Sequence, residues 1–132
     1  MARVLGPGGF FFKVNDPENL KQWYSRHLGL AFDEYGGVKF DFAEQAQSDR
    51  ESYVLWGMFR ADTDYFGPHK HDFMFNFRVD DLDGILERLA AEGVEILPER
   101  EEEYYGRFAW VLDPEGHKIE LWEPPLRQGD TQ

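Results

Sequence analysis

The sequence predicts an α+β domain built from two βαβββ modules, and three observations lead to this prediction. First, residues 12–30 and 77–94 both begin with a Phe–Lys/Arg–Val–Asx–Asp segment and end on Gly and an aliphatic residue. Second, the interval from Asp16 to Leu30 equals the interval from Asp80 to Val94. Third, apolar residues inside both intervals recur at i, i+3, i+4, i+7 and i+8, which places one apolar stripe on an α-helix. A strand–helix unit used twice predicts two half-domains that enclose a pocket.

The first module is expected over about residues 8–60. Its helix follows a strand at residues 10–14, with Asp16 as N-cap, Pro17 in the first turn and Gly29 as the left-handed residue after the last turn. The other predicted elements are strands at residues 30–34 and 38–42 joined by a hairpin turn at 35–37, a loop at 43–51, and a fourth strand at 52–60.

The second module is expected over residues 71–125, after a turn-rich linker at residues 61–70 and before a tail at residues 126–132. Its elements repeat the order of the first module. They are a strand at 72–79, a helix at 81–91, strands at 94–97, 107–112 and 117–123, a charged loop at 99–103 and a tight turn at 113–116. The whole chain, residues 1–132, is therefore predicted to be a single domain.

Alternation along the strands assigns side chains to two faces. In the strands at 10–14, 72–79 and 117–123, one face is apolar and suited to pack under a helix, whereas the other mixes polar and aromatic residues, which favours the wall of a cavity over bulk water. The residues assigned to the mixed face are Phe11, Lys13, Met74, Asn76, Arg78, Lys118, Glu120 and Trp122.

Composition narrows the classes of partner. The formal net charge of −12 disfavours nucleic acid and anionic membrane surfaces, because both require clustered Lys and Arg. The chain has no cysteine, which excludes disulfides and thiolate chemistry and is typical of a cytoplasmic protein. No signal-peptide pattern or membrane-length apolar run is present in the sequence. An aromatic fraction of 17% exceeds the usual need of a small core and favours a ring-lined pocket.

The ending FAWVLDPEGHKIELWEPP, together with the strand–helix–Leu-Gly-Leu unit of the first half, resembles the glyoxalase/bleomycin-resistance/extradiol-dioxygenase (vicinal oxygen chelate) superfamily. The resemblance covers the chain from about Phe10 to Pro125. It implies that the two modules form an open, U-shaped barrel around a pocket, and that the protein is a homodimer.

Members of this superfamily that use a metal take one His, Glu or Gln ligand from each of four strands. The resemblance places the eighth-strand ligand on Glu120, the first-strand ligand on Gly9 or a neighbouring Phe, the fifth-strand ligand on Met74 or Phe73, and the fourth-strand position near Trp56. Since a transition metal needs three or four O or N donors, one carboxylate cannot hold it. The sequence therefore predicts that the usual metal site is missing. An alternative set for Zn, Ni, Mn or Fe is His69, His71 and Glu120, although both histidines precede the fifth strand in a loop.

Glu120 is the principal candidate for a functional residue, either as a hydrogen-bond acceptor or general base in the cavity, or as the partner of Lys13 or Arg78 in a structural ion pair. Trp56, Trp110 and Trp122 form either an aromatic box for a planar ligand or part of the core or dimer interface. Three further predictions concern single side chains: Tyr65 is a lid or a plug, Arg78 is an anion clamp or a strand-end residue, and His117 lies at the surface.

Two functions follow. The first is metal-independent binding of a small aromatic or amphipathic molecule, in which Phe11, Lys13, Trp56, Tyr65, Met74, Asn76, Arg78 and Trp122 contact the ligand. The second is a metal-dependent lyase, isomerase or dioxygenase that uses Glu120 as ligand or base.

Overall fold

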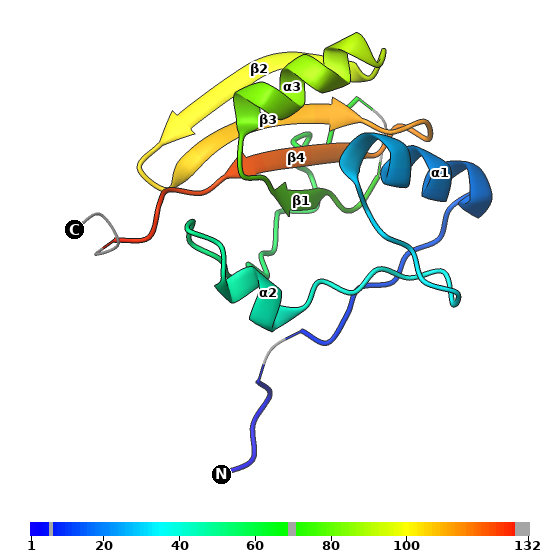
Figure 1. Cartoon of the computed structure of the whole chain (residues 1–132). Helices are drawn as coiled ribbons and strands as arrows, with labels where there is room; N and C mark the ends of the chain where they lie inside the picture. Colours follow the sequence, from blue (N-terminus) through cyan, green and yellow to red (C-terminus); the bar gives the residue numbers. More distant parts are fainter. Residues whose placement is uncertain (6, 69–70, 129–132) are drawn as a thin grey trace.

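The computed structural model describes residues 1–5, 7–68 and 71–128 and has a mixed α+β architecture with an open four-stranded sheet. The elements in chain order are α1 (Pro17–Leu28), α2 (Phe42–Ala46), β1 (Phe75–Arg78), α3 (Leu82–Ala91), β2 (Glu95–Glu103), β3 (Gly106–Leu112) and β4 (Lys118–Glu123). The sheet order is β1-β4-β3-β2, with β1 parallel to β4 and the other pairs antiparallel. Helices α1 and α3 lie on the same side of the sheet, and the segment carrying α2 runs below it in the view of Figure 1.

Helix α1 begins and ends where the sequence predicts. The Asp16 carboxylate accepts a hydrogen bond from the Asn19 amide, and Pro17 occupies the first turn, where a missing N–H leaves no bond unmade. Gly29 closes the helix with φ of 73°, a left-handed conformation that glycine adopts without a Cβ clash. The helix buries Leu20, Tyr24 and His27.

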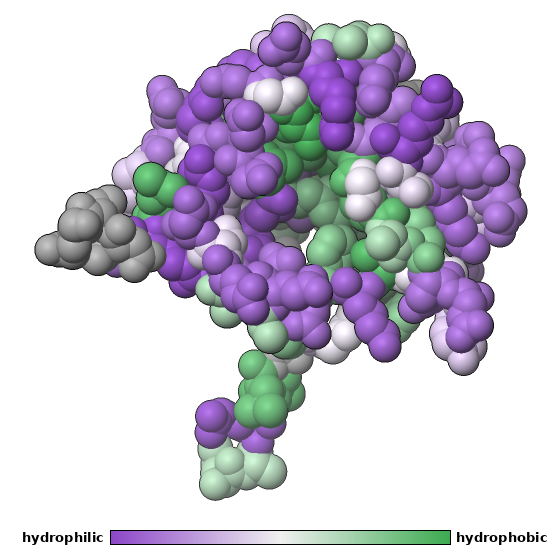
Figure 2. Space-filling view, viewed as in Figure 1, coloured by the Kyte–Doolittle hydropathy of each residue, from purple (hydrophilic) through white to green (hydrophobic). Residues whose placement is uncertain are grey.

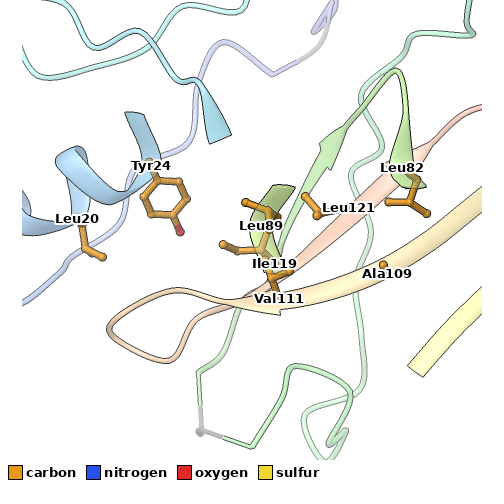
Figure 3. Close-up of a cluster of buried hydrophobic side chains, with 8 residues drawn as sticks. All are labelled: Leu20, Tyr24, Leu82, Leu89, Ala109, Val111, Ile119 and Leu121. Atoms are coloured by element: carbon orange, nitrogen blue, oxygen red, sulfur yellow. The ribbon is translucent and has the colours of Figure 1, made fainter. Parts of the chain in front are cut away.

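The main core lies between the two helices and the sheet. Figure 3 shows its eight buried members, which come from α1, α3, β3 and β4: Leu20, Tyr24, Leu82, Leu89, Ala109, Val111, Ile119 and Leu121. Side chains at alternate positions of β3 and β4 point into this core, as the period-2 pattern predicts. The opposite side chains of the same strands form a second, aromatic cluster of Phe108, Trp110 and Trp122.

The second half of the chain follows the predicted order of strand, helix and three strands, with two differences in extent. The first strand is shorter than predicted, and β2 continues through residues 99–103, which the sequence indicated to be a loop. The β2 strand is at the edge of the sheet, so its charged side chains stay in water and Pro98 breaks no interior ladder. A register shift between Ile96 and Arg100 accommodates the irregularity.

The first half differs from the prediction. Among the described residues before β1, the segments predicted to be strands at 10–14, 30–34, 38–42 and 52–60 form no ladder, and one isolated bridge joins Arg50 to Leu126. Their large apolar side chains are mostly exposed, so the burial of one sheet face, which makes strand pairing favourable, is missing. The turn at 35–37 is present, with the Asp33 amide donating to the Gly37 carbonyl. The division into two βαβββ modules within one domain therefore stays a prediction.

Two further segments depart from the prediction. Residues 43–51 were expected to be a loop, but the Asp41 carboxylate accepts hydrogen bonds from the Ala43 and Glu44 amides and begins the short helix α2. The first residues of the predicted tail are attached to the segment after α2, because the Arg127 amide donates to the Asp49 carbonyl at 2.8 Å. In the part of the chain that the structure describes, no helix has the length and apolarity to cross a bilayer.

Candidate functional site

Glu120 lies near the middle of β4 and has three hydrogen-bond donors of different origin. Its Oε2 accepts from the Tyr65 hydroxyl at 2.7 Å and from the Trp110 indole Nε1 at 3.0 Å, while its Oε1 accepts from the Asn76 side-chain amide at 2.7 Å. Strand pairing accounts for two of these donors, because Asn76 on β1 and Trp110 on β3 both face Glu120 across the ladders. All three donors are uncharged, and the carboxylate is an acceptor held in one place.

Aromatic rings form the wall beside this carboxylate. The Phe108 and Trp122 rings are stacked at 6.1 Å with an interplanar angle of 1°, and Trp110 continues the row at 6.5 Å from Phe108. Tyr53 contacts the Trp122 ring edge-on at 5.2 Å, and the Trp122 indole donates to the Tyr105 carbonyl at 2.8 Å. The indole planes are therefore fixed by both packing and hydrogen bonds.

Tyr65 covers this wall and is held at two points. Its hydroxyl donates to Glu120, and its carbonyl accepts a hydrogen bond from Lys118 Nζ at 2.7 Å. The same Nζ lies 4.5 Å from the centre of the Tyr65 ring and 5.4 Å from the centre of the Trp110 ring, both within cation–π range. Burial and the hydrogen bond to Glu120 raise the pKa of the Tyr65 phenol, so Tyr65 remains a donor at neutral pH.

The structure brings together five of the nine predicted site residues and leaves four apart: Phe11, Lys13, Trp56 and Arg78. Glu120, Asn76 and Tyr65 share the hydrogen-bond network, and Met74 and Trp122 belong to the aromatic cluster around it. In contrast, Phe11, Lys13 and Trp56 are exposed, with Phe11 at 96% and Trp56 at 70% of full accessibility.

The predicted ion pair of Glu120 with Lys13 or Arg78 is wrong. Among the described residues, the Glu120 carboxylate is bound by the three uncharged donors instead. Arg78, at the end of β1, instead donates to the Gln45 side-chain carbonyl of α2. It lines two cavities on another part of the surface, of about 250 Å³ and 560 Å³, and neither of them is lined by Glu120 or Trp122. Tyr65 thus covers the aromatic wall, and these two cavities lie on another part of the surface.

Sequence reasoning missed one residue of this site, Phe108, and one contact, that of Lys118 with Tyr65. Phe108 alternates with Trp110 on β3, and that spacing indicates a shared face once β3 is paired with β4. Lys118 alternates with Glu120 in the same way, but the sequence carries no signal for its contact with the Tyr65 ring, which lies far away in the chain.

A second polar cluster lies in the core beside the tight turn. The Tyr24 hydroxyl donates to Asp113 Oδ2 at 2.7 Å, and His117 Nδ1 lies 2.6 Å from the same oxygen. His117 is 2% exposed, so its predicted surface position is wrong: its ring packs against Phe73 and Phe75 while its polar edge faces Asp113. Burial, reinforced by the adjacent Asp113 charge, raises the pKa of Tyr24.

The donors at the superfamily's metal positions do not fit a transition metal. Gly9, Met74 and Phe73 offer no O or N side-chain donor, and both oxygens of Glu120 already accept hydrogen bonds. Within residues 1–5, 7–68 and 71–128, no group of three or more His, Asp or Glu residues is arranged to hold a metal. His69 lies outside the described residues, so the alternative set with His71 and Glu120 stays a prediction. His71 itself lies beside His117, with ring centroids 4.3 Å apart.

Comparison with solved structures shows the same fold in proteins of low sequence identity. A protein of unknown function from Agrobacterium tumefaciens is 23% identical with a TM-score of 0.51, covering 91% of this chain and 98% of that one. An antibiotic binding protein from a Streptomyces species is 23% identical with a TM-score of 0.51, covering 84% and 88%. A glyoxalase/bleomycin resistance protein/dioxygenase superfamily member from Sphaerobacter thermophilus is 21% identical with a TM-score of 0.49, covering 83% and 90%.

Sequence comparison gives the family. No curated protein matches the chain significantly. The family model described as Glyoxalase/Bleomycin resistance protein/Dioxygenase superfamily matches residues 9–121, which include α1, the whole sheet apart from the end of β4, and Glu120. The chain therefore belongs to the glyoxalase/bleomycin resistance protein/dioxygenase superfamily.

Proposed function

We propose that this protein binds a small aromatic or amphipathic molecule on the face of the sheet that carries Glu120 and Trp122, without a metal ion. The observation that carries this proposal is the Glu120 carboxylate, an acceptor fixed by three uncharged donors beside a row of stacked rings. A planar ligand would stack on the rings and donate an O–H or N–H to Glu120 in place of the Tyr65 hydroxyl. One protein of similar fold is an antibiotic binder, which supports small-molecule capture as a use of this fold.

Tyr65 has the role of a lid in this proposal. Its phenol occupies the acceptor that the ligand needs, so binding exchanges one O–H···O bond for another and gains ring stacking. The charge on Glu120 strengthens either bond relative to a bond between neutral groups.

The test compares two probes that differ in a single donor, 2-naphthol and 2-methoxynaphthalene, titrated by calorimetry. We expect 2-naphthol to bind at one equivalent per chain, without being consumed and with the same affinity in the presence of EDTA. Glu120→Gln should weaken it by about tenfold or more, because a hydrogen bond to a charged acceptor contributes about 1.5–3 kcal/mol. Tyr65→Phe is the matched control. It removes the hydroxyl that competes with 2-naphthol for Glu120 and leaves the Glu120 carboxylate in place, so 2-naphthol should still bind. Equal affinity of the two probes for the unmodified protein would contradict the proposal.

The alternative is a metal-dependent lyase, isomerase or dioxygenase, favoured by the position of Glu120 on the strand where the superfamily places a carboxylate ligand. Elemental analysis of protein purified without an affinity tag separates the two functions. About one equivalent of Zn, Ni, Mn or Fe per chain would support the enzyme. Protein that binds 2-naphthol while free of metal would support the binder.

We propose in addition that the protein is a cytoplasmic homodimer. The absence of cysteine supports the location. Apolar side chains left exposed in the first half support the association, because monomeric proteins seldom expose a large contiguous apolar surface. These side chains belong to Phe10, Phe11, Phe12, Phe40, Phe42, Tyr53, Val54, Leu55, Trp56, Met58 and Phe59.

A further inference from the structure

Two cavities adjoin at the end of β1, on the side of the sheet covered by α1 and α3. The smaller, here called the apolar cavity, has a volume of about 250 Å³ and is lined mostly by hydrocarbon, including Leu30, Val38, Phe40 and Phe77. The larger, the polar cavity, has a volume of about 560 Å³ and is lined by polar groups of α2 and of the segment before α3. The two cavities share four of their lining residues, Leu28, Arg78, Val79 and Ile85. Figure 2 shows apolar surface around a hollow between the upper body and the segment that carries α2.

Arg78 stands where the two cavities meet, and its charge is not matched by an adjacent carboxylate. Among the described residues its guanidinium has a single acceptor, the neutral side-chain carbonyl of Gln45, and no carboxylate within ion-pair distance. The nearby Arg127 also binds neutral acceptors, the Ser48 and Ala46 carbonyls and the Ser52 hydroxyl. Partial burial and the charge of Arg127 lower the pKa of Arg78, as expected for a cation that lacks a counter-ion.

Four carboxylates also line the polar cavity. Glu44, Asp80 and Asp81 are exposed, and the Asp81 carboxylate caps α3 through the Gly84 amide, whereas Glu51 is partly buried. Arg50 lines the same cavity and is partly buried, but its charge is matched by Glu123, 3.8 Å away, and it donates to the Asp80 and Pro124 carbonyls. Water screens the three exposed carboxylates more than the partly buried Arg78, which leaves Arg78 as the position in the cavity that favours an anionic group.

We propose that the paired cavities bind an amphipathic organic carboxylate, with its carboxylate on Arg78 and its hydrocarbon body in the apolar cavity. The planar guanidinium suits this group, because two parallel N–H donors match the two oxygens of a carboxylate. The apolar cavity has room for about eight water volumes, which suits a chain or ring of moderate size. This site is separate from the Glu120 face and does not depend on its proposed function.

The test uses octanoate as probe and measures its affinity by calorimetry beside three analogues. Butyrate keeps the charge and shortens the hydrocarbon, 1-octanol keeps the hydrocarbon without charge, and octylammonium reverses the charge. We expect octanoate to bind at one equivalent per chain and more tightly than every analogue. Its affinity for the unmodified protein should fall as the NaCl concentration rises, because salt screens the attraction to Arg78. Octanoate that binds no better than 1-octanol, or independently of salt, would overturn the proposal.

Variants locate the site. Arg78→Gln should weaken octanoate by about ten- to hundredfold, the loss expected for a charge-assisted pair, and should leave 1-octanol unchanged. The matched control is Arg60→Gln, which removes an exposed arginine paired with Asp62 and should change nothing. If Arg78→Gln does not fold, judged by circular dichroism, Val38→Ala in the apolar cavity replaces it and should weaken octanoate more than butyrate.

The Glu120 variant separates this proposal from the previous one. Glu120→Gln should leave octanoate binding unchanged, since Glu120 lines neither cavity. Loss of octanoate binding in Glu120→Gln would place the carboxylate on the aromatic face and refute a separate site.

Discussion

Two carboxylates of this protein, the buried Asp113 and the partly buried Glu120, have different roles because their partners differ. Asp113 binds Tyr24 and His117 in the core and accepts backbone amides of its own turn, so all of its acceptor capacity is used internally. Glu120 is held by side chains alone, and one of them, Tyr65, comes from a segment that the sheet does not include. Of the two, Glu120 is the acid whose partner can be exchanged without breaking the fold.

Alkaline pH should destabilise the protein through Tyr24. Its folded-state pKa is raised, so the unfolded chain loses this proton first, and the stability that the protonated phenol contributes is present below about pH 10 and lost as the pH rises further. Above that pH the free energy of unfolding should fall by up to about 1.4 kcal/mol per pH unit for this one group. Urea unfolding across the alkaline range measures the slope.

Tyr24→Phe should reduce that slope, at a cost near neutral pH of about 1–2 kcal/mol for the lost hydrogen bond to Asp113. Tyr35→Phe is the matched control, because it removes a phenol that is 90% exposed. Identical alkaline slopes for the two variants would show that the burial of Tyr24 does not govern the effect.

At the scale of elements, the turn between β2 and β3 determines how closely Trp122 packs. Gly106 begins β3 with φ of 137°, and a Cβ at this position would lie 2.3 Å from Trp122 Nε1 and 2.6 Å from the Glu123 carbonyl oxygen. The neighbouring Tyr105 carbonyl accepts the Trp122 indole N–H. The absence of a side chain therefore lets the strand end approach the indole that forms the wall of the site.

Gly106→Ala should lower the free energy of unfolding by about 2–5 kcal/mol, the sum of backbone strain and an overpacked contact. Binding of 2-naphthol should weaken as well, because Trp122 must move. Gly57→Ala is the control, since a Cβ there meets nothing within 4 Å. Chemical denaturation followed by circular dichroism measures both, and an equal, small effect of the two substitutions would refute the close approach at Gly106.

At the scale of the whole molecule, burial is uneven along the chain. The second half contributes most of the core, whereas the segments around residues 10–12, 40–42 and 53–59 leave apolar side chains in contact with water. Extended segments with unpaired backbone groups and exposed apolar residues favour association with an identical surface. The proposed homodimer would cover them.

Sedimentation analysis should therefore give a mass of twice the 15.5 kDa chain. Met58→Glu should shift the protein to monomer, because it places a charge among these apolar residues at a position that is 83% exposed. Tyr104→Glu, at an equally exposed position in the turn after β2, should leave the dimer intact. A monomeric unmodified protein, or equal effects of both substitutions, would contradict association through the first half.

The sequence predicted best what is encoded locally. The caps of α1, the helix after Asp81 and the alternating faces of β4 depend on neighbouring residues, and the structure has all three. Strand pairing in the first half depends on partners far along the chain, which apolar content alone does not specify. The same limit applies to the site: Glu120 is prominent in the sequence, but its contact with Tyr65 spans 55 residues. His117 was misplaced because its burial depends on Asp113 and on a phenylalanine cluster formed by folding.

The two hydrogen bonds that hold Tyr65 bear on how fast Glu120 can be uncovered. Lys118 holds the backbone carbonyl of Tyr65, and Glu120 holds only the hydroxyl at the far end of the side chain. A rotation about the side-chain torsions releases Glu120 while the carbonyl stays bound. Such rotations take picoseconds to nanoseconds in exposed side chains, and the half-buried Tyr65 ring, packed against Phe59 and Trp110, turns more slowly. Under the proposed function, the acceptor would be uncovered by a single residue turning in place, and ligand capture at this face would not need a rearrangement of the chain.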